Sequence, residues 1–328
     1  MKIKIIILSI LLTLTFSGIQ AQDKSSNTDW FMRAKYGLFV HLLPGENDFN
    51  KVINDFDVDG FAQDCQDAGA GYVFLTLGQS NGYYCSPNAV YNRWTGYAPG
   101  QKCSTRDLPM DLYTALAKKG IKLMLYLNGD VPVEDEHASK SLGASKRAYD
   151  RSNWEFNDTL VQRWAPVMQE WSDRYGDKVC GWWIDGLYSY NGFNKTYAQV
   201  FCDALKHGNP KSIVALNPGV GMKSISECQD FTAGESDDQF NFNTLDQVCK
   251  NRWTEGVQWH ELGYLGKGWG SGEPRFTVAQ MISHLKENVN ANGGVFTFDV
   301  RLDKDFVGSR IHPSHLALLK EVKAAIRK

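Results

Sequence analysis

Asp185 stands at the end of the most aromatic stretch of the sequence, GWWIDGLYSY at residues 181–190, and a glycine follows it directly. A carboxylate framed by apolar side chains is costly to desolvate unless something nearby uses its charge. Cleavage of a glycosidic bond uses such a group, because one carboxylate must attack the sugar or activate water. An aromatic frame that excludes water would also strengthen the stabilisation of a developing oxocarbenium ion. Asp185 is therefore the first candidate for a catalytic carboxylate.

A second carboxyl group is needed to protonate the leaving oxygen, and Glu235 is the main candidate. It ends the short stretch DFTAGE at residues 230–235. Partial desolvation raises the pKa of a glutamic acid, which allows it to act as a general acid near neutral pH. The sequence leaves Glu261, Asp237 and Asp238 open as alternative acids.

Polar and aromatic side chains also lie in or near the ends of the other apolar runs. A sugar presents C–H faces that stack on aromatic rings and hydroxyls that need hydrogen-bond partners. A single polar residue in such a position is more often a loop cap, so the hypothesis depends on convergence of the run ends. The predicted carbohydrate-binding residues are His41, Gln79, Asn81, Asn128, Trp183, Asn217, Trp259, His260 and Trp269.

Eight apolar runs alternate with segments of helical periodicity, and most runs lack period-2 alternation, which is typical of parallel strands covered on both faces. We therefore predict an α/β protein with a single-domain (β/α)₈ TIM barrel, in which reactive groups project from the C-terminal strand ends. A doubly wound open sheet is the alternative, but no G-x-G-x-x-G turn follows the first strand. The predicted strands are 36–42, 72–78, 121–128, 179–186, 212–219, 230–235, 257–264 and 293–300, and the predicted helices are 57–69, 108–120, 158–175, 197–206, 278–289 and 315–326.

The composition is that of a globular protein with a sizeable core: 328 residues, 43% hydrophobic and 22% charged. Lys and Arg number 35 and Asp and Glu 37, so the net charge of −2 gives no electrostatic reason to expect nucleic acid or an anionic membrane as partner. An oligosaccharide or glycoconjugate fits better. EDEH at residues 134–137 is interpreted as a solvated loop, and no zincin, P-loop or serine-hydrolase signature occurs, so we expect no metal or cofactor.

The first 21 residues have the pattern of a secretory signal peptide. Lys2 and Lys4 precede an apolar run from Ile5 to Phe16, and Ala21 is a small residue that a signal peptidase accepts. The run is shorter than the roughly 20 residues that span a bilayer core. We therefore expect cleavage after residue 21, export to the periplasm or medium, a barrel over residues 22–328 and no membrane insertion afterwards.

Export permits disulfide bonds, and the sequence contains seven cysteines, so at least one is unpaired. Cys85 and Cys103 flank one loop and are the favoured pair. The other interpretation is that most of these cysteines are small buried hydrophobic residues.

Several motifs, in order, resemble glycoside hydrolase family 29, the α-L-fucosidases. The resemblance implies a (β/α)₈ barrel and a retaining mechanism, with Asp185 as nucleophile, Glu235 as acid/base and His41 in contact with the sugar. The motifs are WFMRAKYGLFVH (30–41), DAGAGYVFLT (67–76), RDLPMDLYTALAKKGIKLMLYLN (106–128), GWWIDG (181–186), DFTAGE (230–235) and VNANGGVFTFDV (289–300).

The sequence also departs from that family. GQSNGY at residues 78–83 stands where the family has Lys-His-His-Asp-Gly-Phe, so Gln79 and Ser80 replace two sugar-binding histidines. Leu42 and Leu43 replace a Trp-Gly pair, and no C-terminal β-sandwich follows the barrel. We therefore expect a divergent member, with fucose or another deoxy- or galacto-configured sugar as substrate. A carbohydrate-binding barrel without turnover, or a purely structural Asp185, are the alternatives.

Overall fold

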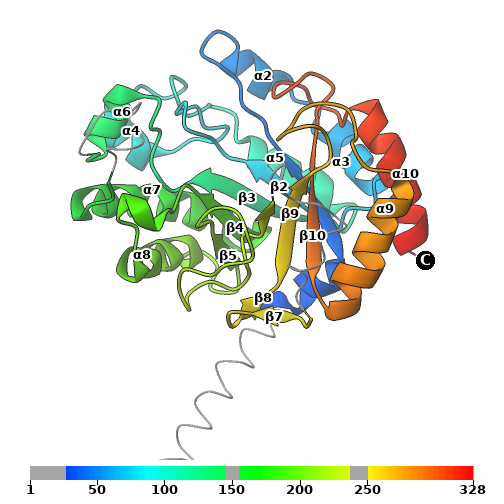
Figure 1. Cartoon of the computed structure of the whole chain (residues 1–328). Coiled ribbons are helices and arrows are strands. Elements are labelled where there is room, and N and C mark those ends of the chain that lie inside the picture. The colour runs from blue at the N-terminus through cyan, green and yellow to red at the C-terminus, as the bar shows by residue number, and fades with distance from the viewer. Residues whose placement is uncertain (1–26, 145–154, 237–249, 328) are drawn as a thin grey trace, which may run out of the picture.

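The computed structural model describes residues 27–144, 155–236 and 250–327. The predicted signal peptide, Asp237, Asp238 and Cys249 lie outside the described residues. Strands occupy the middle of the molecule, with α7 and α8 on one side and α3, α9 and α10 on the other (Figure 1).

Eight parallel strands form one curled sheet within the described residues, in the order β5-β4-β3-β2-β1-β10-β9-β6. The segment before β6 also reaches the opposite end of the sheet, because Asp230 N donates to Val214 O of β5 at 2.9 Å. The architecture is therefore consistent with a TIM-like barrel. The strands are β1 Tyr36–Val40, β2 Tyr72–Thr76, β3 Lys122–Asn128, β4 Val179–Asp185, β5 Ile213–Leu216, β6 Glu235–Ser236, β9 His260–Tyr264 and β10 Val295–Val300, and a separate hairpin pairs β7 Trp253–Thr254 with β8 Val257–Gln258.

Helices follow most strands, and side chains in the sequence mark where they begin. Asn157 accepts a hydrogen bond from Leu160 N at the start of α7, and Asp107 accepts one from Met110 N at the start of α5. The helices are α2 Phe49–Asp55, α3 Val58–Asp67, α4 Ala89–Thr95, α5 Leu108–Ala117, α6 Glu136–Ser141, α7 Asp158–Tyr175, α8 Lys195–Lys206, α9 Val278–Ser283 and α10 Pro313–Ile326, with 3₁₀ turns at Gly176–Lys178, Ser189–Asn191 and Asn290–Asn292 and a π-helix at His284–Val289.

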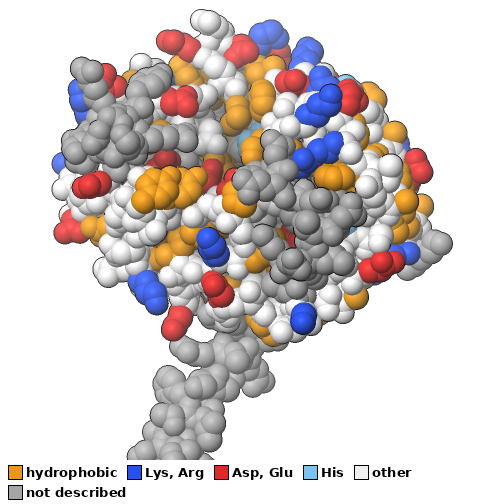
Figure 2. Space-filling model, viewed as in Figure 1, with side chains coloured by type: hydrophobic (Ala, Val, Ile, Leu, Met, Phe, Trp, Pro, Cys, Tyr) orange, Lys and Arg blue, Asp and Glu red, His pale blue; other side chains and the backbone are white. Residues whose placement is uncertain are grey.

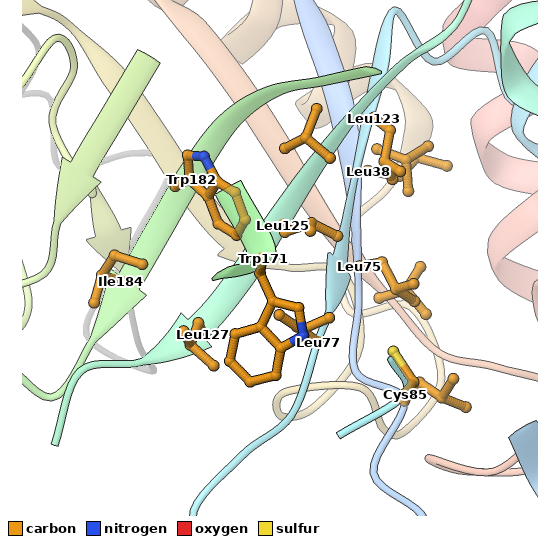
Figure 3. Close-up of a cluster of buried hydrophobic side chains, with 14 of the residues drawn as sticks. Leu38, Leu75, Leu77, Cys85, Leu123, Leu125, Leu127, Trp171, Trp182 and Ile184 are labelled. Carbon is orange, nitrogen blue, oxygen red and sulfur yellow. The ribbon is translucent and has the colours of Figure 1, made fainter. Parts of the chain in front are cut away.

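The two faces of the sheet carry different side chains, although both are buried. Leu125 and Leu127 of β3 and Trp182 of β4 point outward and pack with Trp171 of α7 (Figure 3). The intervening Tyr126 and Trp183 belong to a second, inner cluster of mostly aromatic residues. Because both faces are covered, most of the longer strands are continuous apolar runs in the sequence.

Two predicted strands are shorter in the structure for local reasons. The predicted strand 230–235 is reduced to β6, because Gly234 has a left-handed backbone with φ of 66° and approaches His260 O too closely for any side chain. The predicted strand 257–264 is divided at Trp259, because β8 pairs with β7 in a hairpin whereas β9 joins the main sheet.

The disulfide prediction was wrong. Cys85 and Cys103 are both buried free thiols, whereas Cys202 and Cys228 form a disulfide between α8 and the segment that leads to β6. Tyr84, not Cys85, pairs with Cys103 in a parallel bridge. Adjacent extended residues point to opposite faces, so the Cys85 thiol is directed instead at Thr76 O. Burial raises the pKa of both thiols, as expected for inert core residues.

The surface carries charges of both signs. On the face in Figure 2, Lys and Arg side chains alternate with Asp and Glu side chains among the described residues, without a continuous basic area. In the described ranges 27–144, 155–236 and 250–327, no helix is long and apolar enough to cross a bilayer.

Candidate active site

Asp185 is the last residue of β4, and three hydrogen bonds hold its carboxylate. Oδ1 accepts from Gly186 N at 2.8 Å and from Asn217 Nδ2 at 2.9 Å. Oδ2 accepts from Tyr126 OH, on the neighbouring strand β3, at 2.7 Å. Both oxygens are thus oriented by hydrogen bonds from the following residue and from the neighbouring chain segments at β3 and β5, which holds the carboxylate in one direction.

Glu235 lies beside Asp185, and one amide connects the two carboxyl groups. Asn217 Nδ2 donates to Glu235 Oε2 at 2.6 Å as well as to Asp185 Oδ1 at 2.9 Å. The two oxygens are therefore separated by at most the sum of 2.6 and 2.9 Å, about 5.5 Å. Asn217 Oδ1 accepts from Gly219 N at 3.0 Å, which fixes the orientation of the amide.

A cavity of about 350 Å³ opens on the two carboxylates. Trp183 and Tyr126 form one wall, with their rings stacked at a centroid distance of 5.4 Å, and Trp183 Nε1 donates to Ala233 O at 3.0 Å. Apolar walls with a few fixed polar groups are typical of small-molecule sites. The lining residues are Phe39, His41, Leu43, Gln79, Tyr126, Trp183, Asp185, Glu235, Leu262, Trp269 and Phe306.

His41 brings an imidazole into the cavity from the end of β1. Its Nδ1 donates to Asp299 Oδ1 at 2.8 Å, and Asp299 Oδ2 accepts from Gly270 N at 2.5 Å. The bond to buried Asp299 orients the ring, so that Nε2 is the nitrogen left for a ligand. The ring centroid of Trp269 lies 6.0 Å from that of His41 and completes this wall.

Gln79 also lines the cavity, where it belongs to a chain of polar contacts that ends at Asp185. Its Nε2 donates to Tyr126 OH, and its Oε1 accepts from Ser80 N at 3.0 Å. Sequence reasoning missed Tyr126, because it lies inside a strand rather than at its end. One signal was available: Tyr126 precedes Asn128 by two residues. In a regular strand that spacing places both side chains on the same face.

The structure places Asn81 and Asn128 in loop contacts rather than on the cavity wall. Asn81 Nδ2 donates to Pro44 O at 3.2 Å. Asn128 is buried, and its Nδ2 donates to Val131 O. Both amides hold the loops that follow their strands, which is the common role of asparagine at such positions.

Trp259 and His260 do not line the cavity either, because Trp259 precedes β9 and His260 begins it, whereas the cavity lies at the other end of the strands. Trp259 is fully buried, with Gly294 packed on its ring. His260 contacts Phe31 and donates through Nδ1 to Thr232 O at 2.9 Å. Burial lowers the pKa of His260 to about 4, so this side chain is a neutral core residue at neutral pH.

Of the alternative acids, Glu261 points away from the cavity. It is buried on the outer face of β9, where its Oε2 accepts from His284 Nε2 at 2.8 Å. Asp237 and Asp238 lie outside the described residues. Of the predicted acids, Glu235 is thus the one that the described structure joins to Asp185 through a shared hydrogen-bond donor.

The acidic loop at residues 134–137 has a structural role. Asp135 caps α6 by accepting from Ala138 N and pairs with Lys102 at 3.0 Å. Within the part of the chain that the structure describes, no three His, Cys, Asp or Glu side chains are grouped to hold a metal ion.

Comparison with known sequences identifies the family. Residues 46–323 match the profile of the family described as alpha-L-fucosidase. The chain belongs to the alpha-L-fucosidase family. It is therefore a fucosidase-family glycoside hydrolase. Asp185 and Glu235 lie within the matched region, whereas the first-strand part of the cavity wall, including His41, precedes it. A search among curated proteins finds no match to this alpha-L-fucosidase-family chain.

Solved structures with the same fold include both fucosidases and fucoidan hydrolases. Alpha-L-fucosidase isoenzyme 1 from Paenibacillus thiaminolyticus has a TM-score of 0.65 at 19% identity, covering 93% of this chain and 76% of that one. Endo-fucoidan hydrolase P5AFcnA, from glycoside hydrolase family 107, has a TM-score of 0.69 at 14% identity, covering 91% of this chain and 92% of that one. Endo-fucoidan hydrolase MfFcnA4 has a TM-score of 0.64 at 18% identity, covering 87% of this chain and 52% of that one. This chain therefore spans about half the length of that protein. At these identities the likeness shows the fold alone.

Proposed function

We propose that this protein is an exported, retaining glycosidase that hydrolyses an α-linked fucose or a similarly configured sugar. One observation carries the proposal: a single amide, Asn217, binds Asp185 and Glu235 in one aromatic cavity. Their oxygens are at most about 5.5 Å apart, which suits retention, because inversion needs about 6.5–9.5 Å to admit water. The proposal includes a closed, single-domain (β/α)₈ barrel over residues 22–328.

The proposed reaction has two displacements. Asp185 attacks the anomeric carbon while Glu235 transfers its proton to the leaving oxygen, which breaks the glycosidic bond and forms a glycosyl ester. Glu235 then takes a proton from water, the resulting hydroxyl attacks the anomeric carbon, and the Asp185 carboxylate leaves. The donors from Tyr126 and Asn217 keep Asp185 in position through both steps.

The cavity wall supplies groups that would bind a single sugar ring. Trp183 and Trp269 offer aromatic faces, and His41 presents an imidazole nitrogen to a hydroxyl. Gln79 provides a neutral amide that is already bonded to Tyr126. Since this amide replaces an imidazole of the family pattern, we expect a sugar preference that differs from that of ordinary members.

The test is turnover of a panel of aryl α- and β-glycosides by the purified protein and by Asp185→Asn. We expect turnover of an α-L-fucoside, or of a related deoxy- or galacto-configured α-glycoside, by the wild type only. Asn is isosteric with Asp, so the variant should keep the native melting temperature. Binding of a sugar with no turnover of any glycoside would instead establish a carbohydrate-binding pseudoenzyme. Export is tested by sequencing the N-terminus of the mature protein, which should begin at Gln22.

A further inference from the structure

Two tyrosines stack on the turn that follows Asp185. The rings of Tyr188 and Tyr190 are nearly parallel, with centroids 5.1 Å apart and planes inclined by 8°. Tyr190 is 73% exposed, far more than the other large hydrophobic side chains named as exposed among the described residues, Trp94, Val200 and Val220. An aromatic ring so poorly buried gains little by stabilising the fold.

The turn that carries the pair is anchored by the chain on both sides of it. Leu187 and Phe193 are buried, so both ends of the turn are anchored in the core. Asn191 N donates to Tyr188 O at 3.1 Å, and Phe156 N donates to Asn191 O at 2.7 Å. A rigid aromatic surface loses little conformational entropy when a ligand stacks on it.

The pair also adjoins the two carboxylates. Tyr188 lies against Gly219, whose N–H fixes the Asn217 amide that binds both of them. Burial raises the pKa of Tyr188, and the negative charges of Asp185 and Glu235 raise it further, consistent with their proximity. Yet neither tyrosine lines the cavity that would hold the cleaved sugar. The pair thus lies near the carboxylates but outside the wall of that cavity.

We propose that the Tyr188–Tyr190 pair is a subsite for the leaving group and stacks on the pyranose ring bonded to the cleaved sugar. This inference rests on the proposed function. The leaving group must extend outward from the glycosidic oxygen that the acid protonates, and the tyrosine pair is the aromatic surface next to that acid. C–H faces of a pyranose match the exposed ring of Tyr190. The subsite makes the protein selective for saccharide leaving groups over small ones.

The test compares two substrates that differ only in the leaving group. α-L-Fucosyl fluoride has no ring to stack, whereas a fucosylated disaccharide has one; the disaccharide used is the one that the wild type hydrolyses fastest from a linkage panel. We expect Tyr190→Ala to lower the ratio of kcat/KM for the disaccharide to that for the fluoride by about tenfold or more, equivalent to about 1.4 kcal/mol. Tyr190→Phe, which keeps the ring, should leave the ratio within about twofold.

Trp94→Ala is the matched control, because it removes another exposed aromatic side chain, on α4. It should not alter the ratio. An unchanged ratio in Tyr190→Ala, which includes an equal loss with both substrates, would overturn the subsite. A wild type that hydrolyses only the fluoride would overturn it as well.

Failure of the proposed function gives a different result, because the wild type would then hydrolyse neither substrate. In that case, the Kd values of wild type and Tyr190→Ala for the disaccharides of the linkage panel, measured by calorimetry, test the inference. A Kd about tenfold weaker in Tyr190→Ala would support the subsite, and equal or absent binding would overturn it.

Discussion

At the scale of single residues, the Asn217 amide sets the relation between the two carboxylates, because one nitrogen donates to both. A hydrogen bond to a charged group contributes about 1.5–3 kcal/mol. We expect Asn217→Ala to lower kcat/KM by about 10- to 100-fold without loss of secondary structure. Asn128→Ala is the control, since that buried asparagine bonds to Val131 O and Asp130 Oδ1 of the following loop and to neither Asp185 nor Glu235, and it should affect stability more than kcat. Equal kcat/KM in wild type and Asn217→Ala would contradict this role.

Glu235 is expected to act on the leaving group, so the effect of removing its proton should depend on that group. Glu235→Gln cannot donate the proton, but an activated leaving group such as dinitrophenolate does not need it. We expect a loss of at least about 100-fold for an alkyl or sugar leaving group and less than about tenfold for a dinitrophenyl glycoside. Steady-state kinetics with both substrates measures this. Equal losses would show that Glu235 is not the acid.

The sequence predicted several residues of the cavity, but Asn128 also ends a strand and bonds to the following loop instead. Asp185, Glu235, His41 and Gln79 line the cavity as the run ends indicated. Trp259 does not line the cavity, because the apolar run that contains it forms two separate strands, β8 before it and β9 after it. Positions in a continuous apolar run cannot be assigned to the inner or outer face until the register is known, and a slip of one residue reverses them.

At the scale of elements, the Cys202–Cys228 disulfide fastens α8 to the segment that carries the chain to Glu235. Lys206 of α8 reinforces this connection by pairing with Asp230 at 2.6 Å. A disulfide that closes a loop of this size contributes about 2–4 kcal/mol. We expect the Cys202→Ala/Cys228→Ala variant to lose about that free energy of unfolding in urea denaturation.

The control for the disulfide is Cys180→Ala, which removes a half-buried free thiol of β4. Its stability should stay within about 1 kcal/mol of the wild type. Addition of dithiothreitol should bring the wild type to the level of the double variant. A double variant as stable as the wild type would show that the disulfide does not support this connection.

The order and type of the longer elements were predictable, because the spacing of apolar residues and the capping residues mark them. The predicted helix 158–175, for example, is observed as α7 Asp158–Tyr175. The short helices α2, α4 and α6 were not predicted, since six or seven residues within a loop leave little periodicity. Disulfide pairing was not predictable either. It depends on which residues of distant elements face one another, and this is set by tertiary packing.

At the scale of the whole molecule, His260 couples the inner core to pH. Its pKa is lowered from 6.5 to about 4 by burial, so the unfolded chain binds the proton first as the pH falls. The stability contributed by neutral His260 is therefore complete above pH 6.5 and is lost between about 6.5 and 4. We expect the free energy of unfolding to fall between about pH 7.5 and pH 5 by about 2 kcal/mol more in the wild type than in His260→Gln.

Urea denaturation at the two pH values measures the effect, and comparison with His260→Gln removes contributions from other groups such as His315, whose pKa burial also lowers. Parallel pH dependence in the two proteins would contradict a buried neutral His260.

Asp185 and Glu235 are proposed to work together on one acetal bond, from a separation suited to a glycosyl–enzyme intermediate. The most direct test is ¹H NMR of the sugar first released from an aryl α-glycoside, before its anomers equilibrate. A retaining reaction should release the α anomer first. Initial release of the β anomer would show inversion and contradict it.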